Sequence, residues 1–244
     1  MKTAMPVVEV PRSLWSDAGY ALRRNRAAMT AAIMLGLLAL LVVFGPLLSP
    51  YAYDKPDWEH IAMPPTLADG HLFGTDALGR DLLSRTLQGG RMSLLVGLVS
   101  TIVSLVIGIA WGATAGFIGG RTDRIMMRIV DILYALPFMF LVILLMVLFG
   151  RQIVLIFVAI GAINWLDMAR IVRGQTLGLK QREFVEAARV SGVGTARIIL
   201  RHIVPNLLGV VVIYVTLTIP QVILVESFLS FLGLGVQEPM TSWG

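Results

Sequence analysis

Cysteine is absent from this 244-residue sequence, and charged residues are scarce. The absence of cysteine excludes disulfides, iron–sulfur clusters and thiolate zinc sites. Only 14% of the residues are charged and 57% are hydrophobic, whereas a soluble domain carries about 25% charged and roughly 45–50% apolar residues. This composition excludes an ordinary cytosolic enzyme, a disordered chain and a small secreted module. Because the apolar residues form long blocks without strand-like alternation, the sequence predicts an all-α polytopic membrane protein.

Histidine is also rare, and the signatures of nucleotide binding and hydrolysis are missing. The three histidines, His60, His71 and His202, are scattered, and no pair has metal-ligand spacing, so we predict no metal site. The sequence contains no Gly-Lys dipeptide, and therefore no phosphate-loop lysine. The glycine-rich stretch 74–81 likewise lacks the lysine and hydroxyl residue that contact phosphate and Mg²⁺. No G-x-S-x-G or H-E-x-x-H motif occurs, so a membrane enzyme is a minor alternative.

Five charge-free stretches are candidates for membrane spans. They are residues 27–48, 92–120, 132–150, 152–166 and 203–225. A helix needs about 20 apolar residues to cross the hydrocarbon core, so four of the stretches suffice alone. The stretch 152–166 is expected to continue past Asp167. The first stretch is too long for the apolar part of a cleaved signal peptide, which predicts that it stays as an anchor.

The distribution of lysine and arginine predicts the orientation of the chain. If the N-terminus is cytoplasmic, three quarters of the 20 Lys and Arg residues lie on the inner side. This bias follows the positive-inside rule, and it explains the net charge of +5 without a nucleic-acid partner. We therefore expect residues 1–26 in the cytoplasm and residues 49–91 outside.

The external segment 49–91 divides into two parts. Four prolines in its first half predict an extended loop. In its second half, leucines from Leu78 to Leu87 recur at helical spacing and predict an amphipathic helix, with Thr75 as its N-cap. Gly89-Gly90 is expected to end that helix.

Small and acidic residues within the spans have two possible meanings. Gly108, Gly112 and Gly116 recur every four residues, which is typical of close helix packing; lining a transport pathway is the alternative. Glu226 lies in an apolar run with no nearby base, so we regard it as a candidate to face a polar cavity or a partner subunit.

Two further acids lie at the inner ends of spans. Asp131 follows Arg128 by three residues, and Asp167 precedes Arg170 by three. Both spacings predict interfacial ion pairs within one helix.

The internal loop 167–205 is far longer than the 2–8 residues that a simple helix connection needs. It predicts two short helices, the first ended by Gly192 and Gly194, the second capped by Thr195 and stopped by Pro205. On the first helix, small residues and one aromatic share a face: Phe184, Ala187, Ala188 and Ser191. Glu186 lies beside this face, able to pair with Arg182 or Arg189. We interpret the loop as a docking surface for another protein; a solvated basic connector is the alternative.

This loop also carries a recognisable pattern. Glu-Ala-Ala, three residues and Gly occupy 186–192, and His-Ile-Val-Pro-Asn follows at 202–206. The pattern resembles the EAA loop of ABC importer permeases. Three further stretches, 73–81, 165–174 and 226–235, are similar to the C-type subunit of the oligopeptide/dipeptide/nickel permease family. The resemblance covers about residues 20–244. The residues at 169–175 and 203–206 favour oligopeptide permeases within the family.

The resemblance implies a permease subunit with the type I ABC importer transmembrane fold, whose core spans 92–244. It implies a bacterial inner-membrane complex with a homologous partner permease, an extracytoplasmic substrate-binding protein and two ATP-binding subunits. ATP and Mg would sit on those subunits, and this chain would carry no cofactor. The implied ATPase-coupling residues are Glu183, Glu186, Ala187, Ala188, Gly192 and Pro205. The implied candidates for contacting the binding protein are Asp76, Arg80 and Asp81.

Substrate and span number follow from the same resemblance. Peptides are the expected substrate, and nickel chelates or glutathione are alternatives within the family; a secondary transporter is a more distant one. The family has six spans, the last of which follows the Ser-Trp-Gly motif at 242–244, so we expect five of six in this C-terminally truncated sequence.

Overall fold

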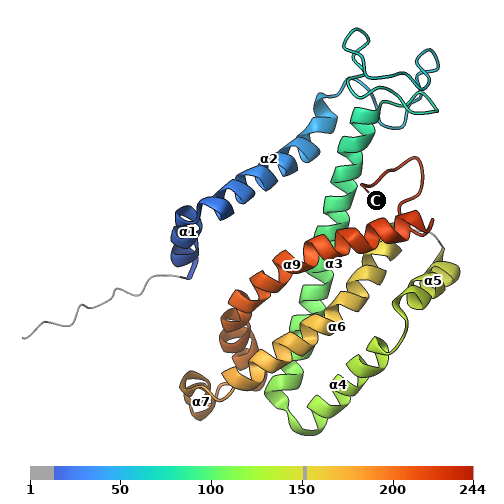
Figure 1. The fold of residues 1–244 in the computed structure, drawn as a ribbon. Helices are drawn as coiled ribbons and strands as arrows, with labels where there is room; N and C mark the ends of the chain where they lie inside the picture. The colour runs from blue at the N-terminus through green and yellow to red at the C-terminus, as the bar shows by residue number, and fades with distance from the viewer. Residues whose placement is uncertain (1–13, 151–152, 244) are drawn as a thin grey trace, which may run out of the picture. The chain divides into compact units, whose positions relative to one another are not determined.

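The computed structural model describes residues 14–150 and 153–243, and these residues are predominantly helical (Figure 1). Within them, one isolated bridge, between Thr75 and Asp81, is the sole strand-type pairing. The chain divides into two units at Pro50. Among the described residues, three helices are long and apolar enough to cross a membrane: Arg26–Leu47, Leu82–Ile118 and Thr195–Phe231. The expected all-α class is therefore confirmed. The first 13 residues of the expected cytoplasmic segment 1–26, including Lys2 and Arg12, lie outside the described part.

The first unit holds α1 (Leu14–Arg24) and α2 (Arg26–Leu48). Asn25 caps α2 by accepting a hydrogen bond from the Ala28 amide at 3.1 Å. Helix α2 occupies the first expected span. Most of its large apolar side chains are exposed, as is typical of a helix that faces lipid; they include Leu35, Leu37, Leu40 and Leu41, whereas Val42 is buried.

The second unit is built along α3 (Leu82–Ile118), a helix of 37 residues. Asp81 caps it by accepting a hydrogen bond from the Ser84 amide at 2.7 Å. The predicted cap at Thr75 and the predicted end at Gly89-Gly90 are both wrong. Residues 75–81 form a turn, and the helix runs through both glycines. Gly89 serves close packing instead, because a Cβ there would lie 3.1 Å from the Ser242 carbonyl carbon.

Three helices follow: α4 (Gly120–Tyr134), α5 (Phe138–Phe149) and α6 (Ile153–Leu179). The stretch 132–150, expected as one span, is broken between α4 and α5, because Pro137 lacks the amide hydrogen that a continuous helix needs. Residues 151–152, between α5 and α6, lie outside the described residues. Helix α6 continues past Asp167 as expected, so residues 167–179, expected as part of the loop 167–205, are helical.

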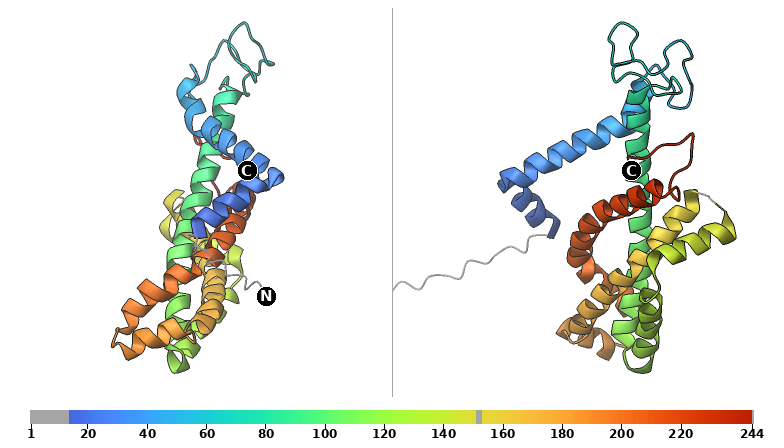
Figure 2. Two further views of the ribbon diagram at one scale, coloured as in Figure 1. Left: turned by 90° about the vertical axis from the view of Figure 1, so that its left-hand side faces the viewer. Right: turned by 45° about the vertical axis from the view of Figure 1, so that its right-hand side comes forward.

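Helix α6 packs along α3 over most of its length, and α9 (Val204–Phe231) crosses them both (Figures 1 and 2). The three glycines at four-residue spacing make the α3–α6 approach possible. A Cβ on Gly108 would lie 2.5 Å from Met168 Cβ, one on Gly112 would meet the Ala169 carbonyl oxygen, and one on Gly116 would lie 2.9 Å from the Arg173 carbonyl oxygen.

Two short helices, α7 (Glu183–Val190) and α8 (Thr195–Ile198), precede a π-helical turn, η1 (Ile199–Ile203), that leads directly into α9. Two expectations for this region are wrong. Gly194 occupies the cap position of α8, without a side-chain hydrogen bond from Thr195. Pro205 does not stop a helix; it lies in the first turn of α9, where an amide hydrogen has no helical partner to lose.

Residues 232–243 return from the end of α9 to α3 (Figure 2). The Trp243 amide donates to Ser93 Oγ at 3.0 Å, and the Trp243 indole nitrogen donates to the Thr86 carbonyl oxygen at 2.8 Å. Residues 232–243 thus form a strap against the N-terminal part of α3.

Candidate functional sites

The region of α7 and α8 has one face buried in the apolar core and one face exposed. Val185 and Ala188 of α7 are buried, as are Ile198 and Ile203, and all four join one apolar cluster with Phe117 of α3, Met168 and Val172 of α6 and Leu207 of α9. The face turned away from this cluster is exposed; it carries Glu183, Phe184, Glu186, Ala187 and Val190. The small-residue face predicted from the sequence is therefore split, since Ala188 points inward while Phe184, Ala187 and Ser191 are exposed.

Glu186 is exposed on α7. Among the described residues it forms no ion pair with Arg182 or Arg189, so the pairing predicted from the sequence is not found. Arg189 lies over the ring of Phe117 instead, 4.9 Å from its centroid. Glu186 thus presents an unpaired carboxylate on this surface within the described part of the chain.

Gly192 ends α7, as predicted, with φ of +75°, in the left-handed region that favours glycine. A Cβ built on Gly192 meets no atom within 4 Å. The backbone conformation, rather than lack of space in this chain, is therefore the reason for glycine at this position.

Two ion pairs join α6 to α4. Arg173 donates to both carboxylate oxygens of Asp123, at 2.5 and 2.6 Å. Arg170 donates to Asp131 at 2.9 Å and lies over the Tyr134 ring. The pairs predicted within one helix, Arg128 with Asp131 and Arg170 with Asp167, are therefore wrong: Arg170 and Asp131 pair with each other, across two helices.

The Arg173–Asp123 pair also changes how both groups titrate. Hydrogen bonding from the Arg173 guanidinium lowers the pKa of Asp123 below its ordinary value of 3.8. The same bonds raise the pKa of Arg173. Both groups are therefore charged at neutral pH, and the pair is a fixed link between α4 and α6.

A pocket of about 340 Å³ opens between α4, α5, α6 and α9. Its walls are mostly apolar, with four polar side chains, Tyr134, Asn164, Asp167 and Gln221. Asp167, predicted as a partner of Arg170, therefore lies at a pocket. Gly108, Gly112 and Gly116, considered for lining a pathway, face α6 and are not in its wall.

Glu226 is fully buried near the end of α9. Its Oε1 accepts a hydrogen bond from Ser230 Oγ at 2.6 Å, whereas its Oε2 has no hydrogen-bond partner among the described residues. Ser230 in turn lies 3.4 Å from Ser242 Oγ, in the strap. Glu226 therefore faces the strap and not the pocket.

The candidates for binding-protein contact, Asp76, Arg80 and Asp81, lie at the base of the external segment. Arg80 donates to Asp76 at 2.8 Å and to Glu238 of the strap at 3.3 Å. Arg80 and Asp81 are buried, so most of what they contact belongs to this chain. The large apolar side chains exposed on the segment include Trp58, Ile61, Leu67, Leu72, Phe73 and Leu78.

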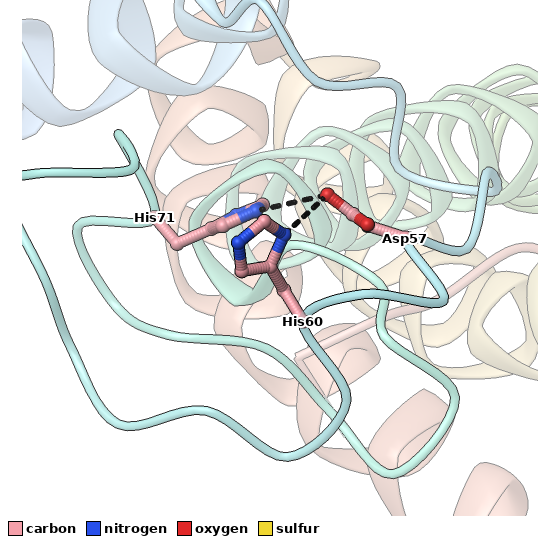
Figure 3. A group of neighbouring side chains, drawn as sticks. All are labelled: Asp57, His60 and His71. Atoms are coloured by element: carbon pink, nitrogen blue, oxygen red, sulfur yellow. Dashed lines mark hydrogen bonds and ion pairs between the residues drawn. The ribbon is translucent and has the colours of Figure 1, made fainter.

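One group of side chains in the external segment was missed by sequence reasoning. Asp57, His60 and His71 lie together, each with a ligand-type atom within 4.8 Å of the others (Figure 3). Asp57 and His60 are three residues apart, but His71 is distant from both in the sequence, and all three lie in loops. His60 and His71, which are scattered in the sequence, are therefore neighbours in the fold, because the loop paths bring them together. The absence of a metal site stays a prediction.

Comparison with known proteins identifies the family. Residues 104–244 match the family described as "binding-protein-dependent transport system inner membrane component", and residues 13–65 match the N-terminal transmembrane domain of oligopeptide transport permease C. The chain is 57% identical over 233 residues to the oligopeptide transport system permease protein OppC of Escherichia coli, covering 96% of this chain and 77% of that protein.

Two other relatives are similar over comparable lengths. OppC of Haemophilus influenzae is 55% identical, with 96% of this chain and 75% of the relative covered. The dipeptide transport system permease protein DppC of Bacillus subtilis is 46% identical, with 95% and 72% covered. Together with its apolar helices, these matches make the chain a multi-pass inner-membrane protein that belongs to the binding-protein-dependent transport system inner membrane component family.

Proposed function

We propose that the chain is one of two permease subunits of an ATP-driven importer of oligopeptides. The support for the substrate is the similarity to permeases named for oligopeptide and dipeptide transport. In this arrangement the N-terminus lies in the cytoplasm, in agreement with the positive-inside distribution of Lys and Arg. A homologous permease completes the pathway, and a substrate-binding protein delivers peptide to the outer face.

The energy for transport enters through the α7–α8 surface, where one of two ATP-binding subunits docks. The observation that carries this step is the division of α7 into two faces. Glu183, Glu186 and Ala187 are exposed for contact, while Val185 and Ala188 are buried against α3, α6 and α9. Because packed interiors resist local compression, a displacement of α7 moves the inner ends of these three helices.

The moved helices also form the pocket. Helices α6 and α9 contribute Asn164, Asp167 and Gln221 to its wall, and the Arg173–Asp123 pair ties α4 to α6. Rigid-body displacement of helices is a common way for a transporter to change its opening. ATP and Mg remain on the ATP-binding subunits. This chain contributes α7, whose displacement moves the packed helices, and half of the pathway.

The test is charge reversal on the docking face in the complete complex. Glu186→Lys is expected to leave membrane insertion and complex assembly of the permeases intact, because its side chain is exposed. Peptide uptake and peptide-stimulated ATP hydrolysis are expected to fall together. Asp54→Lys, also exposed but in the external segment, is the matched charge-reversal control. Normal uptake by the Glu186→Lys complex at normal expression would contradict the docking role.

Substrate class needs a separate measurement. Proteoliposomes with the wild-type complex should accumulate a pentapeptide in competition with other peptides, and neither reduced glutathione nor a nickel chelate should compete. Competition by glutathione would place the chain with relatives such as the glutathione transport system permease protein GsiD, to which it is 38% identical.

A further inference from the structure

The external segment is a compact set of loops tied by backbone hydrogen bonds. The Asp57 amide donates to the Gly79 carbonyl at 2.9 Å, and the Thr66 amide donates to the His71 carbonyl at 3.0 Å. Gly79, with φ of +77°, lies directly against the Asp57 backbone, where any Cβ would collide with the Asp57 carbonyl oxygen. Backbone contacts therefore hold Asp57 and His71 in place independently of their side chains.

Three side-chain atoms converge inside these loops (Figure 3). Asp57 Oδ2 lies 2.9 Å from His60 Nδ1 and 3.7 Å from His71 Nε2. The other oxygen, Asp57 Oδ1, accepts a hydrogen bond from the Glu59 amide at 3.1 Å, which turns Oδ2 toward the two rings. Ligand atoms around a tetrahedral Zn²⁺, with bonds of about 2.0–2.1 Å, lie roughly 3.3–3.4 Å apart. The two distances bracket that separation.

His71 is oriented as a metal-binding histidine is. Its ring is 1% exposed and stacks on Tyr51, with centroids 4.1 Å apart. Its Nδ1 lies 2.9 Å from Asp81 Oδ1, so this nitrogen carries the proton that Asp81 accepts. Its Nε2 is buried and has no hydrogen-bond partner among the described residues. A carboxylate on one ring nitrogen and a free lone pair on the other is the usual arrangement behind a metal-bound histidine.

We propose that Asp57, His60 and His71 bind a divalent transition metal, with Zn²⁺ as the ion that best suits two imidazoles and one carboxylate. Asp81 is the positioning residue, and the half-exposed Asp57 leaves the fourth position open to water. Binding releases the proton that His60 Nδ1 shares with Asp57, because a ligand nitrogen must be unprotonated. Since Asp81 also caps α3, the metal ties the external loops to the outer end of that helix.

The alternative is a metal-free network in which a protonated His71 lies between Asp57 and Asp81. The two assignments differ in a direct measurement. The tag-free wild-type complex, stripped with chelator and given Zn²⁺ alone, is expected to retain one zinc per copy of this chain after gel filtration. Co²⁺ in its place should give the intense visible absorption of a tetrahedral site. No retained metal, or six-coordinate Co²⁺ absorption, would overturn the proposal.

Variants locate the bound ion within the complex. His60→Gln and Asp57→Asn should each reduce retained zinc by one equivalent, and Asp81→Asn, which can still cap α3, should weaken binding by about 10–100-fold. His202→Gln, which removes the histidine of the π-helical turn η1, is the matched control and should retain zinc. Unchanged zinc in both His60→Gln and Asp57→Asn would assign the metal to another subunit and reject the site.

A second measurement uses only the wild-type complex and therefore does not require any variant to fold. X-ray absorption at the zinc edge of the loaded wild-type complex should show four ligands at about 2.0–2.1 Å with the outer-shell signature of two imidazoles. Sulfur ligands or an all-oxygen shell would contradict the assignment. Because this test does not require transport, its failure is distinguishable from failure of the proposed import function.

Discussion

Arg173 of α6 donates two parallel hydrogen bonds, of 2.5 and 2.6 Å, to the carboxylate of Asp123 in α4, although the residues are 50 positions apart in the sequence. The bidentate geometry fixes both distance and angle between the two helices. Asp123 is mostly buried while Arg173 is about one third exposed, so solvent screens the pair only in part.

The first prediction concerns this link. Asp123→Ala is expected to destabilise the complex by about 1–3 kcal/mol, because it removes charge-assisted hydrogen bonds and leaves a half-buried guanidinium without its partner. The measurement is thermal unfolding of the purified complex. Arg173→Ala combined with Asp123→Ala should cost less than the sum of the two single changes, since both remove the same interaction. Strict additivity would show that the pair contributes nothing.

The same pair predicts a pH dependence. The pKa of Asp123 is lowered in the folded chain, so its contribution to stability is fully present above the unfolded value of about 3.9 and is lost as pH falls through the lower folded value. The melting temperature of wild type is therefore expected to fall more steeply than that of Asp123→Asn below about pH 4. Parallel curves for the two proteins would contradict this assignment.

The glycine ridge of α3 supplies a third prediction. Gly112→Leu should disrupt the α3–α6 interface, because even a Cβ at this position would collide with the Ala169 carbonyl oxygen. Gly174→Ala, on α6 and with no atom within 4 Å of its added Cβ, is the matched control and should be neutral or slightly stabilising through helix propensity. The readout is the yield of folded protein in gel filtration. Equal yields of both variants would argue against close packing here.

Gly192 and Gly194 form a natural pair of test and control. Both positions are open to an added Cβ, but only Gly192 of the two has positive φ. Gly192→Val should therefore lower stability by about 1–2 kcal/mol and weaken capture of the ATP-binding subunits. Gly192→Asn should be tolerated better, because asparagine adopts this conformation more easily. Gly194→Ala should behave as wild type; equal damage at both sites would show that contact, and not backbone conformation, restricts this turn.

The absence of cysteine makes the topology prediction simple to test. Single cysteines at Asp69 and Thr86, both exposed in the external half of the chain, should react with an impermeant maleimide in intact cells. Val190→Cys, on the exposed side of α7, should react only after the inner face is opened. The reverse labelling pattern would invert the orientation proposed for the whole chain.

What the sequence reveals about the fold is mainly what is local or periodic. The span at α2, the extension of α6 beyond Asp167 and the two short helices around Gly192 could all be predicted, because apolar length and helix-ending residues act over a few positions. The helix break at Pro137 could also have been predicted from the proline. The stretch 132–150 was instead interpreted as one span, because its length and apolar composition are sufficient for a span and neither depends on a single missing amide hydrogen.

What could not be predicted depends on contacts between distant segments. Arg170 has an acid three residues away, at Asp167, and local spacing favours that pair; helix packing instead brings it to Asp131. The convergence of His60 and His71 likewise depends on loop paths that follow no period. The glycine ridge was recognisable as an interface, but the helix that packs on it was not.

Helix α3 has one further consequence. At 37 residues and 1.5 Å per residue, it measures about 55 Å, against about 30 Å for the hydrocarbon core. Its first residue follows the cap that contacts His71, and near its last turn Phe117 joins the apolar cluster beneath α7. An uninterrupted helix such as α3 can tilt or rotate, but its length does not change. With the proposed orientation and docking role, events at the outer face and at the α7 surface are therefore mechanically joined through this chain, and one proline in the middle of α3, such as Leu98→Pro, should separate them.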